Sequence, residues 1–345
     1  MTNRRTALAP ILLLALALPL AAQQRIQLKI ASPSPSRSPW DIEQRALAQE
    51  WNKITNGLVS VTFYDTYSLG GEKGVLQKFR SVRPGQKAPL DGAIFSTIGL
   101  SELAPNAHIY TLSIPFLIRS QDELDLVLSQ FGSKFTDPIK AAGFELITWT
   151  NIGWLSFYTK EPFRTLPELK RIKIASAGLD SPVLGDSFTA AGFTIENIPA
   201  SKLLQEIKGN TSIRGFYAVH LFSYVTGLSK SVSHALDTKL CPVMAGLVIS
   251  RESWDRIPAE YKPAMIAAVE RMRVRLNASL DESDRQYVAK MSAEGVKMVR
   301  PTGAELTAWE TEFARDIDAV SRAAPGVFDL DLYRKIQALL KSKRS

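Results

Sequence analysis

Hydrophobic and polar residues alternate with a period of two over residues 26–31 and again over residues 59–63. Strict alternation of this kind predicts two half-buried strands. Between them, Ser38 and Pro39 predict the start of a helix, because serine caps free backbone N–H groups and proline is tolerated in the first turn. Gly57 predicts the end of that helix. The first part of the fold is therefore expected to run strand, helix, strand.

Short apolar or alternating segments farther along the chain predict more strands. They cover residues 90–95, 144–158 with a break at Gly153, 172–175, 213–219 and 243–249, with a short helix over 203–207. The segment over 243–249 is apolar throughout, which is typical of a strand covered on both faces. Strands that alternate with helices favour mostly parallel sheets with helices on both faces, so the predicted fold class is α/β.

One helical pattern is much longer than the others. After Pro263, apolar residues recur at three- and four-residue steps over residues 265–291, and Gly295 follows as a stop. About 30 helical residues at ~1.5 Å each give a rod about 45 Å long. Such a rod exceeds one small domain, so we expect it to lie across two lobes. Thr302 and Glu305 predict a capping box at the start of the next helix.

Composition and length fit a globular protein of two domains. The chain has 345 residues, of which 45% are hydrophobic and 22% charged, and these values exclude a disordered or fibrous chain. The net charge of +8 permits a nucleic-acid or membrane-surface partner. The positive charges are scattered, however, and not arranged in a stripe with aromatic residues. We therefore expect no nucleic-acid partner.

The first 22 residues are built like a secretory signal peptide. Arg4 and Arg5 precede an apolar stretch over residues 8–20, and small residues lead to Ala22. A membrane-spanning helix needs ~20 apolar residues, so the stretch is short for one, although an uncleaved anchor remains the alternative. No cysteine follows the stretch, which excludes lipid attachment there. We expect cleavage near Ala22 and a periplasmic protein.

Residue types that carry catalysis or hold metals are scarce. Cys241 is the only cysteine, which excludes a disulfide framework, and its apolar neighbours predict burial. His108, His220 and His234 lack partners at metal-ligand spacing, so each is expected to be an ordinary surface or core histidine and no metal or cofactor is predicted.

A glycine cluster at residues 70–74 is weakly similar to a phosphate-binding loop. It contains Lys73 but lacks the Gly-Lys-Ser/Thr signature, so it predicts a glycine turn that begins a helix. No Gly-x-Ser-x-Gly segment presents a nucleophilic serine. The absence of these motifs favours a binding protein over an enzyme.

Several segments, in order and spacing, are similar to one known family. They read "KIAS", "PWDIEQRALAQEWNKITNGLVSVTFYDTYSLGGEKGVLQKFR", "LDGAIFSTIGLSELAP", "IPFLIRSQDEL", "PFRTLPELKRIKI" and "GLVISRESWDRIP", followed by the long helix. Over most of residues 26–315 the chain resembles the extracytoplasmic solute-binding proteins of tripartite ATP-independent periplasmic (TRAP) transporters, of the DctP type.

The resemblance implies a two-lobed periplasmic-binding-protein fold with mixed sheets, strands that cross twice between the lobes, and one long helix that braces both. We expect lobe I over residues 23–148 and 235–258, lobe II over 149–234 and 296–345, and the helix over 259–295. A cleft between the lobes would close on a small solute. The implied partners are the membrane permease subunits of such a transporter and, as in some members, a tetratricopeptide-repeat lipoprotein.

The chain departs from the family where a carboxylate would be held. Members that carry organic acids use an arginine in a "Lys-Ile-Arg" strand, and the matching position here is Ala175. A second family arginine follows a glycine in the crossing strand, where this chain has Trp154 and Leu155. The family's "Asp-Gly" turn reads Arg214-Gly215. A bidentate arginine–carboxylate pair is strong and selective, so its loss indicates a different solute.

We therefore expect a neutral or hydrophobic solute in a pocket with aromatic walls. The residues expected to line it are Trp40, Tyr67, Phe95, Ser96, Thr97, Trp154, Ala175, Phe188, Arg214, Phe216 and Tyr217. Trp154 and Phe216 are the strongest candidates for contact, because they neighbour the replaced family positions. Ordinary core packing remains the alternative for each aromatic residue.

Three other interpretations stay open. Arg214 would hold an acid if it formed an anion clamp from the other side of the cleft, although a solvated turn residue is the simpler interpretation. A sensor or interaction module that acts on a membrane partner would keep the same fold. A periplasmic enzyme would need a nucleophile–base pair, and the sequence provides none.

Overall fold

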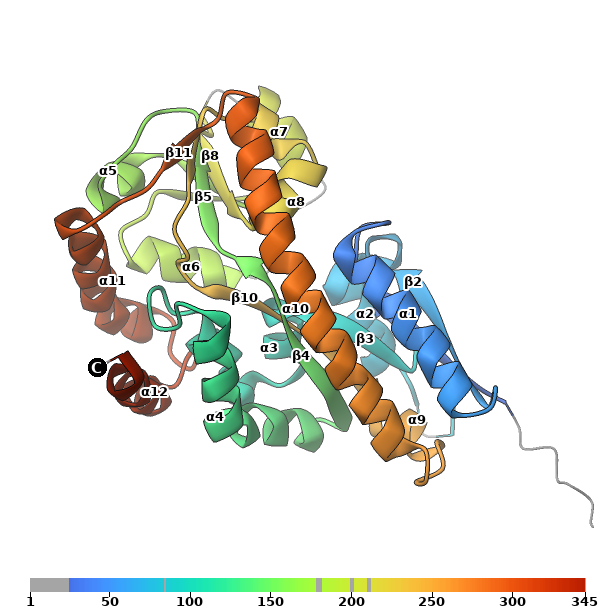
Figure 1. Ribbon diagram of the computed structural model, residues 1–345. Coiled ribbons are helices and arrows are strands. Elements are labelled where there is room, and N and C mark those ends of the chain that lie inside the picture. The colour runs from blue at the N-terminus through green and yellow to red at the C-terminus, as the bar shows by residue number, and fades with distance from the viewer. Residues whose placement is uncertain (1–24, 84, 178–181, 199–201, 210–211, 345) are drawn as a thin grey trace, which may run out of the picture.

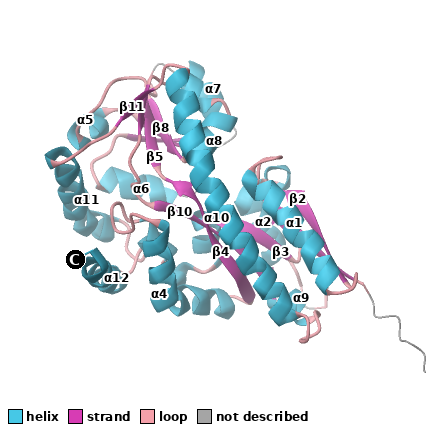
Figure 2. Cartoon of the chain, viewed as in Figure 1, coloured by secondary structure: helices cyan, strands magenta, loops and turns pink. Residues whose placement is uncertain are grey.

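The computed structural model describes residues 25–344 except 84, 178–181, 199–201 and 210–211. The expected signal peptide lies outside these residues. The chain alternates between strands and helices and forms two separate sheets, which confirms the α/β class (Figures 1 and 2).

The first sheet, sheet A, has five strands in the order β2-β1-β3-β10-β4. They are β1 (Ile26–Ser32), β2 (Val59–Asp65), β3 (Gly92–Ser96), β4 (Phe144–Trp154) and β10 (Pro242–Ser250). β1 pairs in parallel with β2 and β3, whereas β10 is antiparallel to β3 and β4. The sheet is thus mixed and not mostly parallel, because β10 enters it from the other sheet and runs in the opposite direction.

The second sheet, sheet B, has six strands in the order β11-β9-β5-β8-β6-β7. They are β5 (Ser156–Thr159), β6 (Ile174–Ala177), β7 (Ile195–Ile198), β8 (Gly215–Ala218), β9 (His234–Leu236) and β11 (Lys297–Val299). β6 is parallel to β7 and β8, and β5 is antiparallel to β8 and β9. The mixed sheets of the resemblance are therefore present in both halves.

The chain passes between the sheets at two neighbouring places. The first is Leu155, the single residue between β4 and β5, and the second is residues 237–241 between β9 and β10. The two passages are joined, because the Leu155 N–H donates to the Cys241 carbonyl over 3.0 Å. Gly153, with φ +138°, lies within β4, and the break predicted at Gly153 falls two residues later, at Leu155.

Helices that cover sheet A begin where the sequence indicates. Ser38 caps α1 by accepting from the Asp41 N–H, and Gly70, with φ +91°, precedes α2. This group comprises α1 (Pro39–Ile54), α2 (Gly71–Arg80), α3 (Thr97–Leu103), α4 (Gln121–Ala141) and α9 (Arg251–Asp255), with 3₁₀ helices η1 (Tyr67–Leu69), η2 (Pro105–Ala107) and η3 (Ile109–Ser113).

Most of the remaining helices lie around sheet B (Figure 1). They are α5 (Leu166–Arg171), α6 (Pro182–Ala190), α7 (Leu203–Gly209), α8 (His220–Val225), η5 (Leu228–Ser231) and α11 (Ala304–Ala323). The last helix, α12 (Leu330–Arg344), packs instead on α4 and η3: its buried leucine and isoleucine residues join the core beside sheet A, and Arg344 Nε donates to Glu123 Oε1 over 2.8 Å.

The long helix α10 (Lys262–Ala293) has 32 residues and is therefore about 48 Å long. Figure 1 shows it running diagonally from the end near α9, past α1, to the end near α7 and α8. Met265 and Leu276 pack in the core beside sheet A, and Met291 packs in a core of sheet B. Because it contributes to both cores, α10 spans both lobes, as the sequence predicts.

The expected residue bounds of the lobes stay a prediction. Two features favour shifting them: β9 pairs within sheet B, so the second passage begins after Leu236, and α12 packs on α4, which favours lobe I for residues 330–344. In the described part of the chain, no helix combines the length and apolar character of a membrane span.

Candidate functional site

A cavity lies between the two sheets, beside the two chain passages. Its volume is about 160 Å³. Ser96 and Thr97, at the carboxyl end of β3, line one side, and Tyr217, near the carboxyl end of β8, lines the other. Solutes of open α/β sheets bind at such strand ends, so we regard this cavity as the candidate pocket.

The wall of the pocket is almost entirely apolar. It includes Ile114, Phe188, Phe313, Ile317 and Phe328. Such a wall favours the binding of an apolar body by removing it from water.

Asp316 is the only charged residue among the described residues that line the pocket. Its Oδ2 lies 2.5 Å from Lys170 Nζ, so this carboxylate is already paired with a cation. No described lysine or arginine lines the pocket.

The start of α3, at the edge of the pocket, presents backbone N–H groups that can bind a negatively charged group. The side chain of Glu72 fills it: this carboxylate accepts from the Ser96 N–H over 2.5 Å, from Ser96 Oγ over 2.8 Å and from the Gly99 N–H over 3.2 Å. Burial raises the pKa of Glu72, and the hydrogen bonds from Ser96 oppose that shift. The protein's own carboxylate therefore occupies the donors at the start of α3.

Four of the predicted site residues line the pocket. They are Ser96, Thr97, Phe188 and Tyr217. Phe188, from α6, and Tyr217, from β8, pack with ring centroids 5.0 Å apart. The structure thus brings two of the expected aromatic residues and both expected hydroxyls to one place.

Ala175 and Phe216 lie elsewhere, in the core on the other face of sheet B. Both are fully buried and pair across β6 and β8, and Phe216 stacks on Tyr158 with ring centroids 4.7 Å apart. Successive residues of a strand point to opposite faces, so Tyr217 reaches the pocket and Phe216 does not. The structure does not bring either residue into the candidate pocket.

Arg214 is also outside the pocket. It precedes β8, at the opposite end of the strand from the pocket edge, and its guanidinium pairs with the carboxylate of Glu161. The anion clamp considered for Arg214 therefore has no support in this arrangement.

Trp154 ends β4 one residue before the pocket begins. It is 5% exposed and packs in the core beside sheet A, and Lys239 Nζ lies 5.0 Å from its ring centroid. The next residue, Leu155, does line the pocket. The prediction that this passage contributes to the site thus fits the neighbouring residue better than Trp154 itself.

The remaining predicted residues are distributed over lobe I. Trp40 packs, partly buried, against the core beneath α1, and Phe95 is fully buried with an edge-on contact to Phe79. Tyr67 is 58% exposed. None of these three lines the candidate pocket.

Residues that the sequence analysis did not single out complete the pocket. Ser113 and Ile114 come from η3 and the turn after it, and Phe313 and Asp316 come from α11. A signal existed only for Leu155, because the resemblance implies an arginine at Trp154 or Leu155. The contribution of α11 depends on long-range packing, which no local pattern reveals.

Cys241 lies in the second chain passage and lines the pocket. Its side chain is buried, as predicted, and burial raises the pKa of the thiol to about 12. A thiol with so high a pKa is a poor nucleophile at neutral pH.

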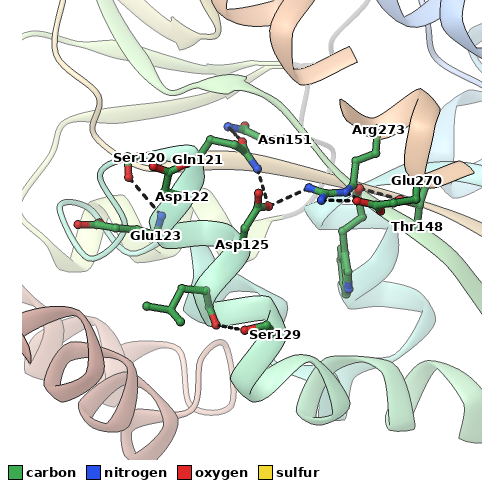
Figure 3. Close-up of polar contacts among 12 residues, drawn as sticks. Ser120, Gln121, Asp122, Glu123, Asp125, Ser129, Thr148, Asn151, Glu270 and Arg273 are labelled. Carbon is green, nitrogen blue, oxygen red and sulfur yellow. Dashed lines mark hydrogen bonds and ion pairs between the residues drawn. The ribbon is translucent and has the colours of Figure 1, made fainter. Parts of the chain in front are cut away.

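A network of polar side chains joins α4, β4 and α10 (Figure 3). Asn151 Nδ2 donates to Gln121 Oε1, Gln121 Nε2 donates to Asp125 Oδ1, and Arg273 Nη1 pairs with Asp125 Oδ1 over 2.8 Å. Arg273 also pairs with Glu270. The second cavity, beside this network, has about 10 Å³, which leaves room for about one water molecule and none for a solute.

His220 is buried on the far side of sheet B. Its Nδ1 lies 2.5 Å from the Tyr158 hydroxyl, and burial lowers the pKa of the imidazole while the charges of Asp284 and Asp237 partly oppose that shift. Burial also raises the pKa of the Tyr158 hydroxyl. Within the described chain, no three histidine, cysteine, aspartate or glutamate residues are grouped so that they could hold a metal ion.

Solved structures of the same architecture come from several bacteria. A TRAP periplasmic solute-binding protein from Ochrobactrum anthropi superposes with a TM-score of 0.79 at 18% identity, covering 93% of this chain and 97% of its own. One from Desulfovibrio salexigens, with bound orotic acid, gives 0.77 at 15% identity, covering 91% and 99%. At such low identity these similarities establish the two-lobed fold.

Sequence comparison gives evidence about the family as well as the fold. A protein of Verminephrobacter eiseniae (strain EF01-2) described as "Solute-binding protein" is 24% identical over 295 residues, which cover 81% of this chain and 80% of that protein. Residues 30–323 match the family described as "Bacterial extracellular solute-binding protein, family 7", or DctP, whose members bind solutes for transporters and are not enzymes. The chain belongs to this DctP family of extracytoplasmic solute-binding proteins.

Proposed function

We propose that this protein binds a small, uncharged and mainly apolar solute in the pocket between its lobes and delivers it to a TRAP-type membrane permease. The solute stabilises the closed arrangement of the lobes, and the permease recognises that arrangement. The observation that carries the proposal is the apolar wall of the candidate pocket, in which Asp316 is the one charged group among the described lining residues.

The proposed solute differs in class from those of several related structures. Relatives have been solved with orotic acid, D-glucuronate, L-gulonate and succinate, all of which carry a carboxylate. Where the resemblance implies arginines, this chain has Ala175 and the pair Trp154 and Leu155, and Glu72 occupies the start of α3. Moving a carboxylate out of water without a cation beside it is strongly unfavourable, which supports a neutral cargo.

A thermal-shift screen tests the solute class. A bound solute stabilises the folded protein by mass action and so raises its melting temperature. At a free solute concentration of one hundred times Kd, the stabilisation is about 2.7 kcal/mol. We expect shifts with small neutral aromatic or alicyclic compounds and none with dicarboxylates or sialic-acid-like sugars.

The second candidate function is the same receptor with an acidic cargo, and the carboxylates bound by its relatives favour it. Dicarboxylates that raise the melting temperature at micromolar levels, with no shift from apolar compounds, would establish that alternative and end the neutral-cargo proposal.

The proposed partners are the two permease subunits. We propose a tetratricopeptide-repeat lipoprotein as an additional partner. Export through the predicted signal peptide would place the protein in the periplasm, where it would contact these partners. Uptake of an identified solute into cells or vesicles that contain the permease should require this protein. Solute binding without any effect on uptake would instead support the sensor alternative.

A further inference from the structure

The hydroxyl groups around the pocket share a direction of hydrogen bonding. Thr97 Oγ1 donates to the Met244 carbonyl over 3.2 Å, and Ser113 Oγ donates to the Pro242 carbonyl over 3.2 Å. A hydroxyl has one proton to donate and two lone pairs that accept. Since a carbonyl oxygen only accepts, the proton of each hydroxyl is committed to β10, and each offers only lone pairs to a solute.

The other lobe repeats the pattern. Ser187 Oγ donates to the Val183 carbonyl of its own helix over 2.7 Å. Asp316 presents a carboxylate, which also only accepts, and its cation, Lys170, is not a lining residue. We call Thr97, Ser113, Ser187 and Asp316 the acceptor set.

Backbone donors at the pocket edge are engaged as well. The N–H groups of Ser96 and Gly99 bind Glu72, and the Ile98 N–H donates to Ser96 Oγ over 3.3 Å. Tyr110 and Tyr217 also line the pocket, and the Tyr110 hydroxyl oxygen is itself buried away from the accessible surface. The acceptor set therefore offers a solute lone pairs and no proton.

We propose that the pocket selects an uncharged solute that presents a hydroxyl or N–H donor on an apolar body, because the acceptor set can accept a hydrogen bond from that donor. A solute that only accepts, or an anion, would find no donor in this set. This inference rests on the proposed function and specifies its solute class. An acceptor-only solute of the same size would still be bound through its apolar body, whereas a carboxylate would find no lysine or arginine among the described lining residues.

Probe size follows from the cavity. Its volume of about 160 Å³ is close to that of an engineered apolar cavity of about 150 Å³ that holds benzene. Three matched single-ring probes therefore suit the test: p-cresol, which donates, 4-methylanisole, which only accepts, and p-toluate, which is anionic.

Calorimetry or ligand-observed NMR on the mature chain should rank the three probes. We expect p-cresol to bind about 2- to 10-fold more tightly than 4-methylanisole, the range of one hydrogen bond. 4-Methylanisole has one more carbon and would bind more tightly if burial alone decided the order. We expect p-toluate to bind weakest.

The double variant Thr97→Val with Ser113→Ala removes two members of the acceptor set. Its preference for p-cresol over 4-methylanisole should fall below about 2-fold. The variant Ser129→Ala is the matched control, because Ser129 is an exposed residue of α4 whose hydroxyl donates to the Leu126 carbonyl of its own helix (Figure 3). Ser129 does not line the pocket. This control should keep the wild-type preference.

The outcomes separate the inference from the proposed function. Equal binding of p-cresol and 4-methylanisole to the wild-type protein would overturn the donor preference and leave the apolar cargo in place. Tightest binding by p-toluate would overturn both, and so would a failure of all three probes to bind at millimolar concentration. The wild-type ranking decides the matter even if the double variant does not fold.

Discussion

Phe216 and Tyr217 are neighbours on β8, and their side chains lie in different surroundings. Phe216 is fully buried against Tyr158 in one core of sheet B, while Tyr217 lines the pocket on the other side. The alternation of a strand decides this, and the sequence shows the alternation without showing which face meets the pocket. Ala175, beside Phe216, follows the same face.

Replacing Ala175 by arginine should therefore act on stability. Ala175→Arg would place an unpaired cation in a filled core, and we expect it to lower the free energy of unfolding by about 3 kcal/mol or more. Urea unfolding measures the change. Thr194→Arg, at an exposed position, should stay within about 0.5 kcal/mol of the wild type. An unchanged midpoint for Ala175→Arg would show that this side chain reaches open solvent.

His220 should make stability depend on pH. Burial lowers its pKa in the folded protein below the ordinary value near 6.5, so below pH 6.5 the unfolded chain binds more protons than the folded one. The free energy of unfolding should then fall as pH drops from 7 to 5, by at most about 1.4 kcal/mol per pH unit from this group.

The variant His220→Gln should remove that contribution, so the stability curves of wild type and variant should converge as pH falls. His234→Gln is the comparison, because burial lowers the pKa of His234 too, but this residue is only partly buried. Parallel curves for wild type and His220→Gln would contradict the prediction.

At the scale of elements, local signals located the helices and strands well. The serine cap and proline at the start of α1, the glycine before α2 and the long apolar repeat of α10 all predicted observed features. The direction of β10 and the packing of α12 could not be predicted in this way, because both depend on which distant segment each element meets. The same reason hid Ser113 and Asp316 from the sequence analysis.

Glycines in two elements should respond oppositely to alanine. At Gly153, φ is +138° and an added Cβ would lie 2.9 Å from the Val219 Cβ, so Gly153→Ala should destabilise by about 1–3 kcal/mol. At Gly132, inside α4, an added Cβ meets nothing within 4 Å, so Gly132→Ala should stabilise by about 0.5–1 kcal/mol. Thermal unfolding of the two variants compares them, and a stable Gly153→Ala protein would refute the strain argument.

At the scale of the whole molecule, Cys241 should report on the opening of the pocket. The thiol is buried, its pKa is raised to about 12, and it is the only cysteine of the chain. Labelling by a thiol reagent should be slow in the native protein and complete in urea. Saturating p-cresol should slow native labelling further, because a bound solute covers this part of the wall.

The variant Cys241→Ser supplies the labelling background. Fast native labelling that p-cresol leaves unchanged would show that the thiol is reached from outside the pocket.

The walls of the pocket come from residues as far apart in the chain as Ser96 and Phe328. Contacts of such wide sequence separation form late in folding, since the loops between them must first be closed. A chain that emerges amino terminus first therefore has no complete site until nearly all of it has been released. With the proposed export, solute capture would begin only after translocation ends, and a solute abundant in the cytoplasm would not be carried out with the nascent chain.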